Sequence, residues 1–134
     1  MRPLQWNDFC YFMLIYFENK YIDEMNQLTA RTCVACSLDS RLATPEEINV
    51  FMQQLPSWVI VEEDKIKRLQ RVLTFNNFTE AMVFTQNVAD LAEKESHHPT
   101  ILTEWGKVTV CWWSHKIKGL HLNDFIMAAK TDQL

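Results

Sequence analysis

Two adjacent histidines, His97 and His98, are followed directly by Pro99 in a chain of 134 residues that has four histidines in all. Histidine has an unperturbed pKa of about 6.5, so it can both donate and accept a proton near neutral pH. Proline disfavours helical geometry in the residue before it, so a helix that ends here points neighbouring imidazoles in different directions. The pair therefore indicates proton transfer at a cleft beyond a helix end.

Three further residues have the right chemistry to join this pair. Glu93 lies four residues before His97, on the same face of a helix, and this spacing predicts that its carboxylate orients His97. His115 is expected at the end of the last strand, and Asp124 falls in the first turn of the final helix, where a carboxylate is favoured. Both elements end near loops, where functional sites gather, so we expect these side chains to meet.

Two other interpretations of these residues compete with acid–base chemistry. A histidine pair can simply end a solvated helix. A metal site is the other alternative, although adjacent histidines rarely chelate one ion and no H-E-x-x-H spacing is present. The pair Cys33 and Cys36 is only half of a four-ligand zinc site. We therefore expect no bound metal. The candidate metal ligands are His97, His98, His115, Asp124 and Cys111.

The first half of the chain shows the elements that must position this site. Residues 44–55 begin with Thr-Pro-Glu-Glu, a capping box with proline at the first helical position, which predicts a helix. SWVIVEE and KIKRLQRVLTF then read as two strands joined at Glu63 and Asp64. A second capping box opens at Asn77, and apolar residues at helical spacing carry this helix close to Ser96.

The second half repeats the pattern of two strands and a helix. TILTEW and KVTVCWWS form a hairpin around Trp105 and Gly106, and LNDFIMAAKTD supplies a closing helix. The order α-β-β-α-β-β-α predicts an α+β fold, with a four-stranded antiparallel sheet and helices packed on one face. The exposed edges of such a small sheet favour pairing with another subunit.

Composition narrows the class of protein. The formal net charge is −4 and the basic residues are scattered, so we expect no nucleic-acid partner. Four cysteines without a convincing secretory signal indicate reduced thiols and a cytoplasmic protein. The apolar run at residues 9–17 is too short to span a membrane. We interpret residues 1–24 as an N-terminal extension, either poorly ordered or the product of a misassigned start, and residues 25–134 as the domain.

The spacing of the candidate residues resembles one family, the pterin-4a-carbinolamine dehydratases of bacterial type. The matching pattern is an acidic residue, His-His-Pro, an aromatic, a third histidine and an aspartate, at Glu93, His97, His98, Pro99, Trp105, His115 and Asp124. LPSW at 55–58, EWGKVTV at 104–110 and SHKIKGL at 114–120 match as well, and the likeness runs from about Met25 to Asp132. His121 departs from the pattern, because a serine or threonine is usual there as the cap of the last helix.

The resemblance implies dehydration of 4a-hydroxytetrahydrobiopterin to quinonoid dihydrobiopterin, which recycles the pterin of phenylalanine hydroxylase. It implies no cofactor, since the pterin is the substrate, and a homodimer or homotetramer. By carry-over, catalysis falls to His97, His98 and His115, and the supporting or substrate-binding residues are Glu93, Pro99, Trp58, Ser114 and Asp124, with Trp58 in the wall that holds the ring. We expect His97 and His115 to handle protons and His98 to hold the ring.

A non-catalytic role is the alternative, because animal relatives also act as a dimerisation cofactor of a homeodomain transcription factor. All three motif histidines are present in this chain, which favours the enzyme.

Overall fold

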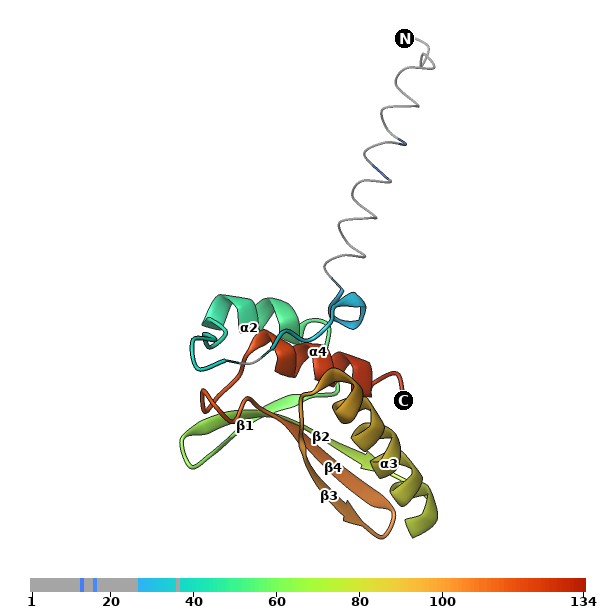
Figure 1. Cartoon of the computed structure of the whole chain (residues 1–134). Coiled ribbons are helices and arrows are strands. Elements are labelled where there is room, and N and C mark those ends of the chain that lie inside the picture. Colours follow the sequence, from blue (N-terminus) through green and yellow to red (C-terminus); the bar gives the residue numbers. More distant parts are fainter. Residues whose placement is uncertain (1–12, 14–15, 17–26, 36) are drawn as a thin grey trace, which may run out of the picture.

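The computed structural model describes residues 13, 16, 27–35 and 37–134, and the remaining trace is drawn in grey (Figure 1). The N-terminal extension expected at residues 1–24 therefore lies outside the described residues, apart from Met13 and Tyr16, and so does Cys36. The elements are a 3-10 helix η1 (Leu28–Ala30), α2 (Pro45–Met52), β1 (Val59–Glu63), β2 (Ile66–Thr74), α3 (Phe78–Glu95), β3 (Thr100–Glu104), β4 (Lys107–Trp112) and α4 (Leu122–Thr131). The α+β fold and its element order are confirmed.

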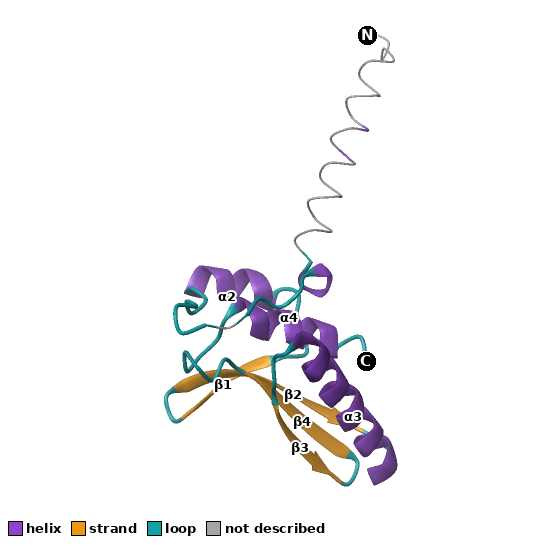
Figure 2. Cartoon of the chain, viewed as in Figure 1, coloured by secondary structure: helices purple, strands orange, loops and turns teal. Residues whose placement is uncertain are grey.

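The sheet has the strand order β1-β2-β4-β3, and every neighbouring pair is antiparallel. Both predicted hairpins form, and the central pair β2/β4 joins them, with Leu69 opposite Trp112 and Leu73 opposite Val108. The three α-helices lie on the same side of the sheet, with α4 over its middle and α3 along β3 and β4 (Figures 1 and 2). His97 lies in the short connection between the end of α3 and the start of β3.

The capping signals in the sequence predicted where helices α2 and α3 begin. At α2 the Thr44 side chain accepts the Glu47 N–H, and the Glu47 carboxylate accepts the Thr44 N–H, which is a complete capping box. At α3 the Asn77 side chain accepts the N–H of Glu80 at 2.8 Å. Each bond satisfies a backbone donor that a helix start otherwise leaves without an intrahelical partner.

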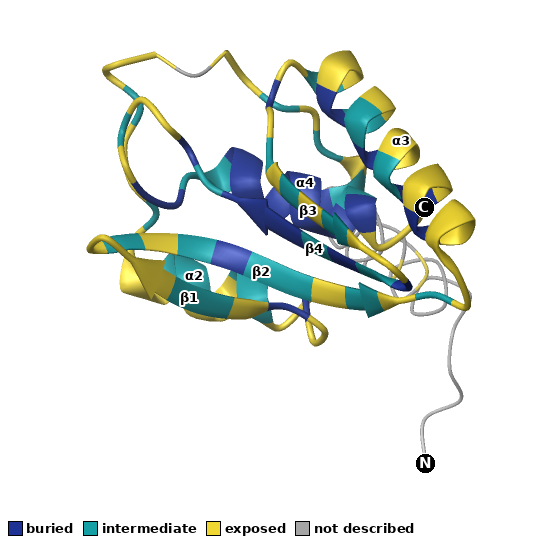
Figure 3. Ribbon diagram, turned by 90° about the horizontal axis from the view of Figure 1, so that it is seen from below, coloured by how far each residue is buried: buried dark blue, intermediate teal, exposed yellow. Residues whose placement is uncertain are grey.

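The hydrophobic core lies between the sheet and α4. Most of α4 is buried, whereas α3 has one buried stripe and an exposed outer face (Figure 3). Trp112 from β4 and Phe125 from α4 are both fully buried in this layer. No described helix combines the length and the apolar character needed to cross a bilayer.

The turn between β3 and β4 depends on Gly106, whose φ of +71° is a left-handed conformation that other residues rarely adopt. A Cβ at this position would lie 2.8 Å from the carbonyl oxygen of Phe75. We predict that Gly106→Ala lowers the free energy of unfolding by about 1–3 kcal/mol, measured by urea denaturation.

Gly119→Ala is the matched control for this turn. There the added Cβ would meet only the flexible side chain of Leu42, at 2.7 Å, and no positive φ adds strain. If both substitutions lower the free energy of unfolding by the same amount, the left-handed turn at Gly106 does not limit stability.

Candidate active site

The end of α3 decides where the two adjacent histidines point. Ser96 has φ 53° and ψ 36°, a left-handed cap, and its N–H reaches the carbonyls of Ala92 and Glu93. The N–H of His97 then bonds the Ala92 carbonyl at 3.1 Å. This reversal turns His97 inward to 7% exposure and leaves the His98 side chain 58% exposed.

The turn also changes the partner of Glu93. We expected its carboxylate to orient His97, but it bonds Nε2 of His98 at 2.8 Å. The spacing rule holds only while the helix continues, and α3 ends at Glu95, before His97. Glu93 and His98 therefore form an exposed pair at the rim, and His97 takes a different carboxylate.

That carboxylate is Asp124, which is fully buried in the first turn of α4. Its Oδ1 lies 2.6 Å from Nε2 of His97, and its Oδ2 accepts the Ser114 hydroxyl at 2.9 Å and the His121 N–H at 2.8 Å. Since an ionised carboxylate can only accept, Nε2 of His97 carries the proton in this bond. The bond fixes the tautomer and leaves Nδ1 of His97 as the nitrogen for proton exchange.

Helix α4 keeps an N-cap although His121 departs from the family pattern. Its Nδ1 accepts the N–H of Asn123 at 3.1 Å, and its own N–H bonds Asp124, so a capping box forms with an imidazole in place of a hydroxyl. Burial lowers the pKa of His121 below its usual value, although the nearby Asp124 opposes this. The neutral ring is the form that can accept a hydrogen bond at Nδ1.

The ring of His97 is also held from one side. It stacks on Trp112, with 5.8 Å between ring centroids and 14° between planes. Trp112 is itself fixed, because its Nε1 donates to Thr131 Oγ1 at 3.1 Å. The His97 imidazole is thus oriented by the Asp124 carboxylate at Nε2 and by the ring of Trp112 on one face.

His115 lies beyond the end of β4, which stops at Trp112, in a turn closed by a bridge between Ser114 and Gly119. Its ring stacks on Trp113, with centroids 4.0 Å apart and planes at 10°. The guanidinium of Arg68 also lies over Trp113, 4.6 Å from the ring centroid. Arg68 in turn bonds Glu63 at 2.5 Å.

The surroundings of His115 favour its neutral form. Desolvation lowers the pKa of His115 most, and the positive charges of His97, Arg68 and His98 lower it further, while Asp124 opposes them. His115 is nevertheless an exposed residue, so its imidazole remains accessible. A neutral and accessible imidazole at pH 7 is suited to accept a proton.

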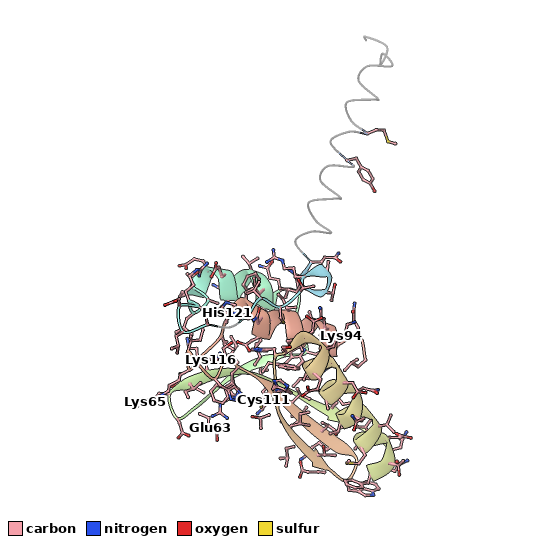
Figure 4. The ribbon with its side chains drawn as sticks, viewed as in Figure 1. Glu63, Lys65, Lys94, Cys111, Lys116 and His121 are labelled. Carbon is pink, nitrogen blue, oxygen red and sulfur yellow. The ribbon has the colours of Figure 1, made fainter. Side chains whose placement is uncertain are left out.

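The three histidines His97, His98 and His115 line one pocket of about 370 Å³. Its other lining residues are Ala35, Ser96, Ser114 and Lys116. Figure 4 labels Lys116 and His121 on the chain between β4 and α4 that carries one side of it. The volume lies at the small end of ligand pockets, which run from about 300 to 1,000 Å³. A larger hollow of about 760 Å³ lies beside α2 and the chain end, but none of the predicted site residues line it.

Four of the predicted site residues do not line this pocket, namely Glu93, Asp124, Trp58 and Pro99. Glu93 and Asp124 each bond a histidine that does. Trp58 packs in the core with 3% exposure, and its Nε1 donates to Asp132 at 2.7 Å. Its position just before β1 puts it at the opposite end of α4 from Asp124, away from the lining of this pocket. Pro99 leads directly into β3 and shapes the chain rather than the pocket surface.

Five contributors were not predicted from the sequence. Trp113 and Arg68 support His115. The pocket wall also includes Ala35, Ser96 and Lys116. The alternation of β4 hinted at Trp113, but nothing in the spacing links it to Arg68 on another strand. Ala35 carries no chemical signal, because its contribution depends only on where the chain passes.

Cysteine chemistry is not favoured at this site. Burial, followed by the nearby Glu95, raises the pKa of Cys33 to about 12, so its thiol stays protonated near neutral pH. Cys111 is buried in β4, and Cys36 lies outside the described residues. Within the described part of the chain, no three His, Cys, Asp or Glu side chains gather as metal ligands would.

The fold and the pocket together define a small α+β protein with a histidine–carboxylate pair suited to proton transfer on a small ligand. Comparison with known proteins gives the family. The chain belongs to the family described as pterin 4 alpha carbinolamine dehydratase, whose model matches residues 41–134. The resemblance noted in the sequence is confirmed.

Similar proteins agree with this assignment. Two relatives carry the name "Putative pterin-4-alpha-carbinolamine dehydratase". The one from Nitrosococcus oceani is 56% identical over 110 residues, covering 82% of this chain and 97% of the relative. The one from Marinobacter nauticus is 54% identical over 110 residues, covering 82% and 99%. A crystal structure of transcriptional coactivator/pterin dehydratase from Brucella melitensis has a TM-score of 0.62 and 28% identity, and covers 69% of this chain and 97% of that chain.

Proposed function

We propose that this protein removes water from 4a-hydroxytetrahydrobiopterin, giving quinonoid dihydrobiopterin, by acid–base catalysis with histidines. The observation that carries the proposal is the buried pair of His97 and Asp124 at a pocket that His98 and His115 also line. Family membership supplies the substrate class, and the pocket supplies groups that fit the reaction.

The reaction needs one proton delivered and one removed. The bond between carbon 4a and its hydroxyl breaks, and the hydroxyl leaves as water with an added proton. Nitrogen 5 loses a proton, and the electron pair of its N–H bond forms the double bond to carbon 4a. The two protons balance, so a pair of imidazoles around one ring is sufficient.

The histidines divide this work according to their surroundings. His97 delivers a proton from Nδ1 to the leaving hydroxyl, because Asp124 holds Nε2–H and stabilises the positive charge on the ring while Nδ1 is protonated. His115 accepts the proton of nitrogen 5, since desolvation and then the charge of His97 lower its pKa and favour the neutral ring. His98, paired with Glu93 at the rim, donates to the pterin ring and holds it.

Acid–base side chains alone are suited to this dehydration, because the reaction needs only a moderate acceleration. The adduct carries its hydroxyl next to an amine nitrogen and already loses water unaided. General acid–base assistance is worth about a hundred- to ten-thousandfold, or about 3–5 kcal/mol of barrier. A rate enhancement in this range requires no group beyond the side chains that line the pocket.

The proposal is tested by turnover of 4a-hydroxytetrahydrobiopterin, generated in the assay by a pterin-dependent phenylalanine hydroxylase. The purified protein is expected to accelerate formation of the quinonoid product, followed by ultraviolet absorbance, at least a hundredfold above the spontaneous rate. Heat-denatured protein at the same concentration is the control. A rate equal to the spontaneous one with folded protein would remove the proposed activity.

The proposal includes a hydroxylase as the source of substrate and a homo-oligomer as the working state. Val59 on edge strand β1 and Leu102 on edge strand β3 are each 56% exposed, which supports pairing of sheet edges between subunits. Sedimentation equilibrium should return a multiple of the 15.9 kDa chain mass. A monomer at assay concentration would contradict this part alone.

A further inference from the structure

Residues 27–35, which we call the arm, run across the ends of α3 and α4 before the chain enters α2. Leu28 anchors the arm in the core with no exposure, and its N–H donates to Gln54 Oε1 at 3.0 Å. At its other end Ala35 is one of the residues that line the pocket. The arm therefore joins the core to the substrate site.

Asn123 holds the arm next to the pocket. Its side chain accepts the Val34 N–H at 3.1 Å and donates to the Val34 carbonyl at 2.7 Å, so both backbone groups of one residue are held by one amide. Asn123 is 1% exposed and directly precedes Asp124 in α4. The element that orients His97 thus also fixes the position of Ala35.

A second anchor holds the preceding residue. The N–H of Cys33 donates to Glu95 Oε2 at 3.2 Å, and Glu95 also pairs with Lys130, with side-chain exposures of 10% and 14%. The Cys33 sulfur contacts the Asn123 carbonyl at 4.0 Å. Two consecutive arm residues are therefore bonded to side chains of α3 and α4 that are fully or largely shielded from solvent, as expected of a wall with a defined position.

The arm lies outside the part of the chain that the family model matches. That match begins at residue 41, whereas Ala35 and its anchored neighbours precede it. The pocket thus combines histidines from the region that the family model matches with a wall from the segment that precedes it. The residues that hold this wall are Asn123 and Glu95, which belong to the matched region.

We infer that residues 33–35 form a wall of the reduced-pterin pocket, with Ala35 at its surface, and that Asn123 is the positioning residue that holds this wall in place. The inference rests on the proposed function. The wall confines a pocket of about 370 Å³ around one bicyclic ring with a short substituent. Its effect is on binding rather than on proton transfer, because Ala35 and Val34 bring no titratable side chain to the site.

The test uses two variants of the full chain and one ligand probe, 7,8-dihydrobiopterin. Asn123→Ala removes both bonds to Val34 and is expected to raise the dissociation constant of the probe and KM about tenfold, with kcat within twofold. Ala35→Phe places a ring in the pocket without touching Asp124, and is expected to raise both at least tenfold. Binding is followed by quenching of tryptophan fluorescence, and folding by circular dichroism.

Gln54→Ala is the matched control, because it also removes a side-chain bond to an arm backbone N–H, but at Leu28, away from the pocket. It should leave the dissociation constant and KM unchanged. An unchanged dissociation constant in Ala35→Phe overturns the inference, and so does an Asn123→Ala variant that loses kcat alone. If Asn123→Ala does not fold, Ala35→Phe decides. A wild-type protein that neither binds the probe nor turns over substrate removes the proposed function, and the inference with it.

Discussion

Asp124→Asn is expected to lower kcat about a hundred- to thousandfold while the protein stays folded, equivalent to about 3–4 kcal/mol of barrier. An amide can still accept the Ser114 hydroxyl and the His121 N–H through its oxygen. Its NH₂ group then faces Nε2 of His97, which must become an acceptor. The proton of the neutral ring moves to Nδ1, and the ring loses the carboxylate that stabilises its doubly protonated, acidic form, so His97 becomes a poor proton donor.

Steady-state rates and nitrogen-15 NMR of the histidine rings check this result together. Asp132→Asn is the matched control, an identical chemical change at the other end of α4, where the carboxylate bonds Trp58 and Arg71. It is expected to reduce stability and to leave kcat within about twofold. A folded Asp124→Asn variant with wild-type kcat would show that the pair with His97 is not part of catalysis.

The fold could be predicted from local signals because each element carries its own. The capping box at Thr44, the side-chain cap at Asn77, the period of α3 and the turn at Gly106 are all short-range patterns, and the structure has each where it was expected. The second half of the capping box predicted at Asn77 does not form, because Glu80 accepts the N–H of Asn76 instead. The meeting of His97 and Asp124, 27 residues apart, followed from the family resemblance and from the order of elements. Local spacing alone would not have paired them.

The errors in the site also have a physical cause. Glu93 was assigned to His97 on helical spacing, but the left-handed Ser96 reverses the chain between them, and no residue type announces that turn at a serine. The family resemblance implies Trp58 in the wall that holds the ring, and this stays a prediction, since within this chain its Nε1 donates to Asp132 in the core. Such outcomes depend on tertiary contacts, which the spacing of residues does not encode.

His115→Gln is expected to lower kcat at least a hundredfold and to change how the rate depends on pH. In the wild-type protein the pKa of His115 lies below the ordinary value of 6.5, because of desolvation and the charges of His97 and Arg68. The neutral base therefore persists below pH 6.5, and the acid limb of kcat/KM should have its midpoint there. The variant should lose that limb, since glutamine does not titrate.

Arg68→Gln examines the cause of this low midpoint without removing the imidazole. It removes a positive charge that lowers the pKa of His115 and the cation over Trp113, so the acid limb should move up toward pH 6.5. Arg71→Gln is the control, because Arg71 lies on the same strand but pairs with Asp132. The profile of the control should match the wild type. An acid limb that stays in place in Arg68→Gln would mean that Arg68 does not contribute to the low midpoint. An acid limb that survives in His115→Gln would mean that another group accepts the proton from nitrogen 5.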